Sequence, residues 1–152
     1  MNKLLKSMFS VFTLLVFACS TLGATTEEIK QNIIMQSKSM GVDPAIMLSI
    51  AKVESGFNQN AKAGSNIGVF QLSTATAKTM GINPFDLNDN IKGGILYYKN
   101  MYNKFGSMEL AVAAYNTGAG TISRNGNSVP SYTKPFVNRI MNNYRQYKQS
   151  GL

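Results

Sequence analysis

The chain contains no histidine and no tryptophan, and Cys19 is its single cysteine. Without histidine, Ser-His-Asp catalysis, Cys-His catalysis and His-containing zinc sites are excluded. A single cysteine excludes disulfides within the chain and thiolate metal clusters. Charged residues are also scarce, at 14% of the chain. We therefore expect neither a metal nor a cofactor.

Strand signals are almost absent as well, and we find no internal repeat or low-complexity linker. A length of 152 residues with 44% hydrophobic residues fits one globular domain with a single core. Apolar residues recur at helical spacing along most of the chain. These features predict a compact, mostly helical domain over residues 25–148, followed by a short tail at 149–152.

The first 24 residues have the layout of a signal peptide. Lys3 and Lys6 form a positive segment, and Met8 to Ala18 is an apolar stretch of about eleven residues, too short to span a bilayer as a helix. Small residues allow cleavage near Ser20 or after Ala24, and we favour Ala24 because a helix-start signal follows it. The protein is therefore expected to be exported, to the periplasm or the cell wall.

Cys19 allows a second interpretation of this segment. Val16-Phe17-Ala18-Cys19 loosely resembles the lipid-attachment motif of lipoproteins, although Phe17 fits it poorly. We favour loss of Cys19 with the signal peptide over its lipidation. Cleavage removes Lys3 and Lys6 and leaves 13 basic and 7 acidic residues, a net charge of +6. An exported basic chain without a clustered Lys/Arg run is not expected to bind nucleic acid.

Helix start and stop signals divide the rest of the chain into segments. Thr25 and Glu28 form a capping box, and glycines at 41, 56 and 81 are placed to end helices. The expected helices cover residues 25–40, 43–55, 72–80, 88–105, 107–114 and 133–147. Residues 57–67, with room for a short hairpin, and 115–120 have the composition of loops. Gly93-Gly94 lies inside a helix, which indicates close approach by a neighbouring backbone.

The most informative feature is a carboxylate on the apolar side of a helix end. The apolar stripe of this helix consists of Met47, Ile50 and Val53, and it ends in Glu54. Burial would raise the pKa of this carboxyl group. A carboxylic acid that stays protonated near neutral pH can protonate a poor leaving group, such as a glycosidic oxygen. The alternative is an exposed glutamate at a frayed helix end.

Most glycoside hydrolases need a second carboxylate, as nucleophile or as base for water. The candidates are Asp43, Asp86, Asp89 and Glu109. Each lies at or just before an expected helix start, where acidic residues are common for local reasons. None of them is flanked by residues that indicate a catalytic pair. A mechanism with a single protein acid would require the substrate to supply its own nucleophile.

Three segments resemble the signature blocks of the soluble lytic transglycosylase family. They are Glu54-Ser55-Gly56-Phe57-Asn58, Gly68-Val69-Phe70-Gln71-Leu72 and Ala114-Tyr115-Asn116-Thr117-Gly118. The blocks occur in the family's order at compatible spacing, and the resemblance covers roughly residues 26–147. It implies a lysozyme-like fold with a short loop or β-hairpin after the catalytic helix, and an enzyme that cleaves peptidoglycan.

The family's chemistry accounts for the missing second carboxylate. By resemblance, Glu54 is the catalytic residue and protonates the oxygen between N-acetylmuramic acid (MurNAc) and N-acetylglucosamine (GlcNAc). It then takes a proton from the C6 hydroxyl of MurNAc while a 1,6-anhydro ring closes. Ser55 would help to orient Glu54, and Tyr115 would lie against Glu54 or the sugar.

The resemblance also implies a set of substrate-binding residues. Gln71 and Asn116 would hold hydroxyl and acetamido groups of the sugar, and Gly68 would provide a tight turn. The full set is Ser55, Gly68, Phe70, Gln71, Tyr115 and Asn116. The chain departs from the family at Val69-Phe70, where Leu-Met is usual, and at Tyr132, where a glutamate is common.

The expected partner is therefore the glycan strand of peptidoglycan, bound by a monomer. Small members of the family commonly open the wall for a secretion, conjugation or pilus machine, and such a machine is a further expected partner. Two other functions stay open at this point. One is a hydrolytic muramidase that uses Asp86 or Asp89 to hold a water, and the other is a non-catalytic protein that binds the wall.

Overall fold

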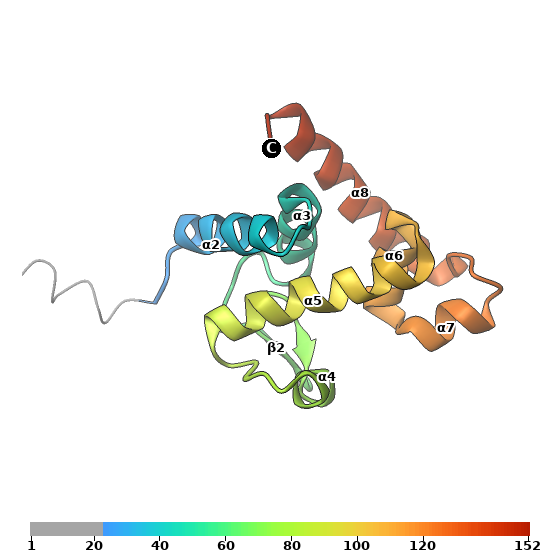
Figure 1. Cartoon of the computed structure of the whole chain (residues 1–152), viewed down its shortest axis with the longest axis horizontal. Coiled ribbons are helices and arrows are strands. Elements are labelled where there is room, and N and C mark those ends of the chain that lie inside the picture. Colours follow the sequence, from blue (N-terminus) through green and yellow to red (C-terminus); the bar gives the residue numbers. More distant parts are fainter. Residues whose placement is uncertain (1–22) are drawn as a thin grey trace, which may run out of the picture.

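The structure is a computed structural model, and it describes residues 23–152 (Figure 1). The predicted signal peptide and Cys19 therefore lie almost entirely outside the described residues. The helices are α2 (Thr26–Ser39), α3 (Pro44–Glu54), α4 (Thr74–Met80), α5 (Leu87–Phe105), α6 (Met108–Thr117), α7 (Ala119–Arg124) and α8 (Lys134–Gln149), with a 3₁₀ turn, η2 (Ser131–Thr133). The strands are β1 (Lys62–Ala63), β2 (Asn66–Ile67) and β3 (Leu72–Ser73). The mostly helical fold is confirmed.

Helix α3 lies at the centre of the domain. It begins at Asp43, whose side chain accepts a hydrogen bond from the backbone N–H of Ala45, with Pro44 in the first turn. Residues 45–51 are all buried, because α3 packs against α2 on one side and against α8 on another (Figure 1). The predicted capping box of Thr25 and Glu28 is present at the start of α2.

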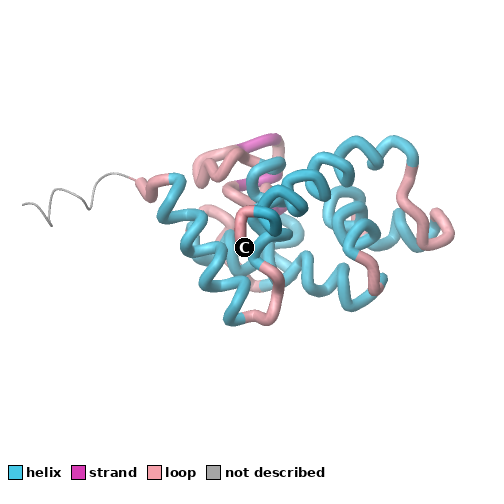
Figure 2. Tube along the Cα trace, turned by 90° about the horizontal axis from the view of Figure 1, so that it is seen from above, coloured by secondary structure: helices cyan, strands magenta, loops and turns pink. Residues whose placement is uncertain are grey.

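The short strands form an antiparallel sheet in the order β1-β2-β3. They gather beside the helices rather than between them (Figure 2). The hairpin anticipated within residues 57–67 is present, with Ala63 paired to Asn66. The third strand corrects the prediction, because Leu72 and Ser73 pair with β2 instead of starting a helix. Helix α4 begins after Ser73, whose hydroxyl caps it by accepting from the Thr76 N–H.

The two glycines inside α5 make room for side chains. A Cβ at Gly94 would lie 2.3 Å from Cγ of Phe70, and one at Gly93 would lie 2.1 Å from Cδ1 of Ile82. A neighbouring segment does approach the two glycines closely, as predicted. It does so with side chains, however, and not with its backbone. The consequence is that Phe70 sits fully buried against α5.

The segment expected to be a loop at 115–120 is largely helical. Helix α6 continues to Thr117, and α7 starts at Ala119. The Thr117 and Thr121 hydroxyls donate to carbonyls four residues earlier, which keeps both residues compatible with helix. The chain breaks only at Gly118, where φ is 82°. Helix α8 also extends to Gln149, past the point where fraying was expected at Lys148.

The core joins α2, α3, α5, α6 and α8. Its largest fully buried side chains include Phe70, Met47 and Ile140. Among residues 23–152, no helix is both long enough and apolar enough to cross a membrane. The end of α3 lies next to the strands, and Glu54 is located between them.

Candidate active site

Glu54 is the last residue of α3, directly after a fully buried stretch of that helix. Its side chain is partly buried, and within residues 23–152 its carboxyl group has no hydrogen-bond or ion-pair partner. Burial raises the pKa of Glu54 from the usual 4.5 to about 7, and the positive charge of Arg139 opposes this rise. The carboxyl group is therefore protonated in a large fraction of molecules at neutral pH.

Glu54 lines a cleft of about 180 Å³ between α3, the strands, α4 and α6. The residues that line it are Glu54, Asn66, Gln71, Leu72, Ser73, Thr76, Tyr97, Tyr115, Asn116 and Gly118. Amide and hydroxyl groups dominate this set, and Glu54 is the only carboxylate among the lining residues that the structure describes. The cleft thus combines one acid with many neutral hydrogen-bonding groups, which suits a carbohydrate rather than a charged ligand.

A network of hydrogen bonds holds the turn between β2 and β3 against the helices. The Ser55 hydroxyl donates to the Val69 carbonyl at 2.7 Å, and the Tyr115 hydroxyl donates to the Phe70 carbonyl at 2.8 Å. The Phe70 N–H donates to Oδ1 of Asn90 at 2.9 Å. Ser55 caps the end of α3, Asn90 lies near the start of α5 and Tyr115 lies near the end of α6. Because each of these three helices contributes one contact, the turn has a fixed position relative to Glu54.

Asn90 is the central residue of this network. Its Nδ2 donates to the carbonyls of Ile67, at 2.8 Å, and Pro84, at 2.9 Å, while its Oδ1 accepts from Phe70. Gly68 lies directly against it, with a φ of 77°, and a Cβ there would be 2.5 Å from Nδ2 of Asn90. Both the backbone angle and the lack of space require glycine at this position.

Gln71 lies at the end of the same turn, with a φ of 46° that is uncommon for a residue other than glycine. Its Nε2 donates to the Gly68 carbonyl at 2.9 Å and to the Ala61 carbonyl at 3.2 Å. These two bonds use both donors of the amide and fix its orientation. The amide oxygen is left as the group that Gln71 can offer to a ligand in the cleft.

Tyr115 forms the wall of the cleft behind Glu54. Its pKa is raised well above the usual value, first by burial and then by the neighbouring Glu54 and Tyr97. The phenol therefore stays neutral and serves as a hydrogen-bond donor to the turn. Its ring meets the ring of Tyr97 edge to face, with centroids 5.1 Å apart. Tyr115 and Glu54 line the same cleft, and the predicted contact between them stays a prediction.

The structure brings four of the predicted site residues into one cleft: Glu54, Gln71, Tyr115 and Asn116. The other three lie behind the cleft wall. Ser55 and Gly68 hold the turn in place, and the Phe70 side chain is fully buried. Their direct binding of substrate stays a prediction, while their present contacts are with the protein.

Sequence reasoning missed several cleft residues and the role of Asn90. Asn66, Ser73, Thr76 and Tyr97 also line the cleft, although none of them was expected to bind substrate. Asn66 and Ser73 lie at positions without a distinctive local signal. Asn90 had a signal, because it is an amide that begins the buried stripe of α5 and is itself 1% exposed. It is the same signal that identified Glu54, a polar group on an apolar face.

Residues 23–152 contain no group of three or more His, Cys, Asp and Glu side chains that could hold a metal ion. The acidic residues other than Glu54 have local partners. Asp86 accepts from the Asp89 N–H at the start of α5, and Asp89 accepts from the Asn83 N–H.

Comparison with known protein sequences finds relatives of one kind. A transglycosylase from Enterobacteria phage PRD1 is 28% identical over 109 residues, which covers 70% of this chain and 39% of the relative. The membrane-bound lytic murein transglycosylase C of Mannheimia succiniciproducens is 30% identical over 125 residues, which covers 68% of this chain and 35% of the relative. The chain thus spans less than two fifths of the length of either protein.

Solved structures of lytic transglycosylases have the same fold as this chain. An inactive glutamate-to-glutamine mutant of the lytic transglycosylase Slt from Pseudomonas aeruginosa superposes with a TM-score of 0.69 at 21% identity, over 79% of this chain and 24% of that one. The 70-kDa soluble lytic transglycosylase in complex with bulgecin A gives 0.66 at 22% identity, over 78% and 24%. Residues 31–135 match the family model of the transglycosylase SLT domain. The chain belongs to this family and has its lysozyme-like fold.

Proposed function

We propose that this protein is a lytic transglycosylase that cleaves the β-1,4 bond between MurNAc and GlcNAc in peptidoglycan and leaves 1,6-anhydro-MurNAc ends. The observation that carries the proposal is Glu54, the one carboxylate of a neutral cleft, with a pKa of about 7. Family membership supports the proposal. So does the inactive glutamate-to-glutamine mutant of the Pseudomonas relative.

The proposed reaction uses Glu54 first as an acid and then as a base. The protonated carboxyl group donates its proton to the glycosidic oxygen as the bond between that oxygen and C1 of MurNAc breaks. The carboxylate formed in this step then accepts the proton of the C6 hydroxyl while O6 bonds to C1. The proton returns to Glu54, no water is consumed, and the products are a GlcNAc end and a 1,6-anhydro ring.

A pKa near 7 suits both halves of this cycle. A carboxyl group with the ordinary pKa of 4.5 would rarely hold a proton at neutral pH, and one with a much higher pKa would be slow to release it. Gln71 and Asn116 lie in the same cleft, and we propose that their amides hold hydroxyl and acetamido groups of the sugar. Tyr115 contributes by holding the turn that carries Gln71.

The geometry favours this reaction over hydrolysis. A hydrolytic muramidase would need a second carboxylate near the cleft to activate water. Asp86 and Asp89, the residues considered for that role, do not line the cleft and instead accept backbone hydrogen bonds around the start of α5. A C6 hydroxyl supplied by the substrate removes the need for such a residue.

We also propose that the protein acts outside the cytoplasm, on the wall, after removal of residues 1–24 as a signal peptide. Its setting would be local opening of the wall for a secretion, conjugation or pilus apparatus. The similarity to the transglycosylase of Enterobacteria phage PRD1 is compatible with action on the wall. Tagging the protein in its host and following its position with and without such an apparatus would test it.

The reaction is tested by mass spectrometry of digested peptidoglycan. We expect products with 1,6-anhydro ends from the native protein and a loss of at least a thousandfold in turnover for Glu54→Gln. Glu109→Gln is the matched control, because this exposed carboxylate does not line the cleft and lies in the first turn of α6. Activity should decline as pH rises above about 7, since the acid form of Glu54 is lost.

Two outcomes would count against the proposal. Reducing MurNAc ends without the anhydro ring would establish the hydrolytic alternative. Binding of peptidoglycan without any cleavage, equally by the native protein and Glu54→Gln, would establish the non-catalytic alternative.

A further inference from the structure

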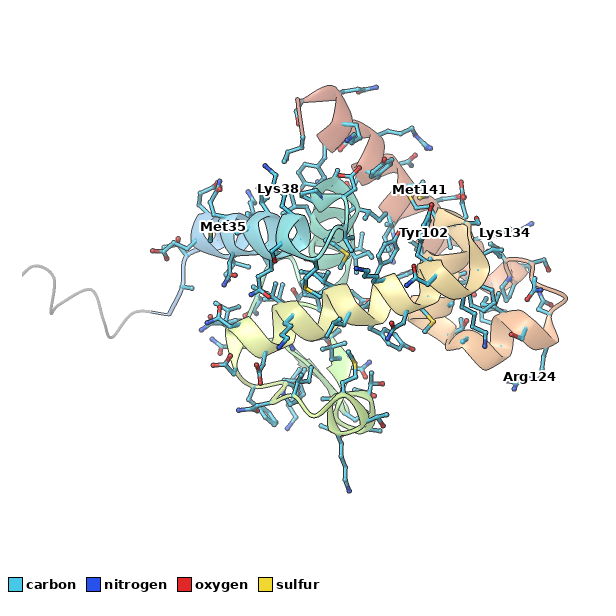
Figure 3. All side chains as sticks on the ribbon, in the orientation of Figure 1. Met35, Lys38, Tyr102, Arg124, Lys134 and Met141 are labelled. Atoms are coloured by element: carbon cyan, nitrogen blue, oxygen red, sulfur yellow. The ribbon has the colours of Figure 1, made fainter. Side chains whose placement is uncertain are left out.

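The charged residues of the chain are divided unevenly between its two parts. From residue 110 to the C-terminus there is no aspartate or glutamate, and the cations there are Arg124, Lys134, Arg139, Arg145 and Lys148. This part comprises most of α6, together with α7, η2 and α8. Arg124 projects from α7 at the end of the molecule, and Lys134 lies at the start of α8 (Figure 3). The C-terminal part of the chain is thus free of acidic residues, and four of its five cations belong to α8.

Arg139 differs from the other cations in its position. Phe136, Arg139, Asn143 and Tyr147 recur every three or four residues and share one flank of α8. The Tyr147 ring lies 5.9 Å from Nζ of Lys52, which belongs to the last turn of α3. This flank therefore faces the end of α3 that carries Glu54. The opposing effect of the Arg139 charge on the Glu54 carboxyl group supports that placement.

Arg139 also has a free guanidinium group. Within residues 23–152 the ion pairs are Lys30 with Glu27 and Lys148 with Asp43, so Arg139 takes part in neither. Its side chain is exposed and makes no hydrogen bond to another described residue, whereas Arg124 donates to the Thr121 hydroxyl. The guanidinium group is planar and can bind a carboxylate through two parallel hydrogen bonds. In Arg139 it is exposed and has no other partner among the described residues, so it is available for such a contact.

We propose that Arg139 binds a carboxylate borne by the muramoyl unit next to Glu54, and that it makes the enzyme select carboxylate-bearing glycan strands. This inference rests on the proposed function. The sugar ring itself is neutral, so the carboxylate comes from the lactyl group of a strand without peptides or from the stem peptide of a substituted strand. Both sources present the same chemistry to Arg139, and both are accessible to an exposed side chain.

The test compares three soluble glycan substrates of equal length. One carries stem peptides, one has lost them and exposes lactyl carboxylates, and in the third the lactyl carboxylates are converted to neutral methylamides. For Arg139→Met we expect kcat/KM to fall about tenfold or more on a carboxylate-bearing substrate, mainly through KM. We expect no change in KM on the methylamide. A loss on the first substrate alone identifies the stem peptide, and a loss on the second identifies the lactyl group.

Two further variants separate recognition from a general effect of charge. Arg139→Lys keeps the charge and should recover part of the lost affinity, but not all of it, because an ammonium cannot form the paired contact. Lys134→Met removes another exposed cation of α8 that lies five residues away, about 140° around the helix. It should leave all three substrates unaffected. Equal losses for Arg139→Met on all three substrates, or no loss on any, would overturn the proposal.

A binding measurement keeps this inference distinct from the reaction. In the Glu54→Gln background, calorimetry with the same three substrates should show the same dependence on Arg139. If the native protein cleaves nothing but Arg139→Met weakens binding of carboxylate-bearing strands, the proposed reaction fails and the recognition stands. If the native protein cleaves and Arg139→Met changes neither binding nor KM, the recognition fails alone.

Discussion

Two regions of different construction act on Glu54: the loop wall, which lines the cleft, and the helix wall, which acts through the charge of Arg139. The loop wall, residues 66–73 with Asn90 and Tyr115 behind them, is neutral, and its turn is fixed by buried hydrogen bonds. The helix wall, residues 131–148 of η2 and α8, carries four cations and no carboxylate, and its charged groups are exposed. The first wall determines the geometry of the cleft, whereas the second provides positive charge.

The difference explains how one carboxyl group can serve as both acid and base. Burial raises the pKa of Glu54, and Arg139 lowers it by a smaller amount. Desolvation is therefore the stronger effect, and the result is a value of about 7. A site with two basic walls would keep Glu54 ionised, and one with two dry, neutral walls would keep it protonated. Burial and the Arg139 charge therefore shift the pKa of Glu54 in opposite directions.

The largest expected effect comes from breaking the loop wall at Asn90. In Asn90→Leu, the Phe70 N–H and the carbonyls of Ile67 and Pro84 lose their partners. A buried polar group without a partner costs about 1–3 kcal/mol, so we expect the free energy of unfolding to fall by roughly 3 kcal/mol or more. Urea denaturation measures the loss, and catalytic turnover should fall with it.

Asn100→Leu is the control for this prediction. Asn100 is exposed on the same helix, and the same exchange there should change the free energy of unfolding by less than about 0.5 kcal/mol. If Asn90→Leu were as stable as Asn100→Leu, the hydrogen bonds of Asn90 could not be what holds the loop wall.

The next effect concerns Glu54 itself, on which both walls act. Its pKa in the folded protein, about 7, lies above the value of 4.5 expected when unfolded. Ionisation of Glu54 therefore opposes folding, and this cost grows as pH rises from 4.5 to 7. Glu54→Gln removes an acid that must ionise, and it should stabilise the protein at pH 8 by at most about 3 kcal/mol.

Thermal unfolding of both proteins at a series of pH values measures this gain. At pH 4, where Glu54 is neutral in both states, the difference between Glu54→Gln and the native protein should shrink towards zero. A gain of the same size at pH 4 and pH 8 would show that it does not come from the ionisation of Glu54. If Glu54 serves catalysis at a cost in stability, Glu54→Gln should be inactive but more stable than the native protein.

Much of the fold follows from signals in the sequence. The capping box at Thr25, the Asp43-Pro44 start of α3 and the glycine at 81 mark real helix ends. These signals act within one turn of a helix, which is why they can be recognised without knowledge of distant contacts. Glu54 was identified for the same reason, as a polar residue on an apolar stripe.

The features that the sequence did not predict depend on contacts between distant segments. Strand β3 exists because Leu72 pairs with Ile67 of β2, and a strand of two residues has no period of its own. The glycines of α5 are explained by side chains that lie far from them in the sequence: Ile82 precedes Gly93 by 11 residues, and Phe70 precedes Gly94 by 24. Likewise, nothing local assigns Arg139 to the neighbourhood of Glu54, since that relation arises from the packing of α8 on α3.

The smallest expected effect is on the helix wall, and it is a shift in pH dependence. Because the Arg139 charge lowers the pKa of Glu54, its removal in Arg139→Met should raise that pKa. The alkaline limb of the pH–rate profile should then move to higher pH. The substrate for this measurement is the neutral methylamide, so that loss of a substrate contact does not alter the profile. Lys134→Met should leave the profile in place, and added salt should reduce the shift because exposed charges are screened. A shift to lower pH, or an equal shift in both variants, would mean that the helix wall does not act on Glu54 through Arg139.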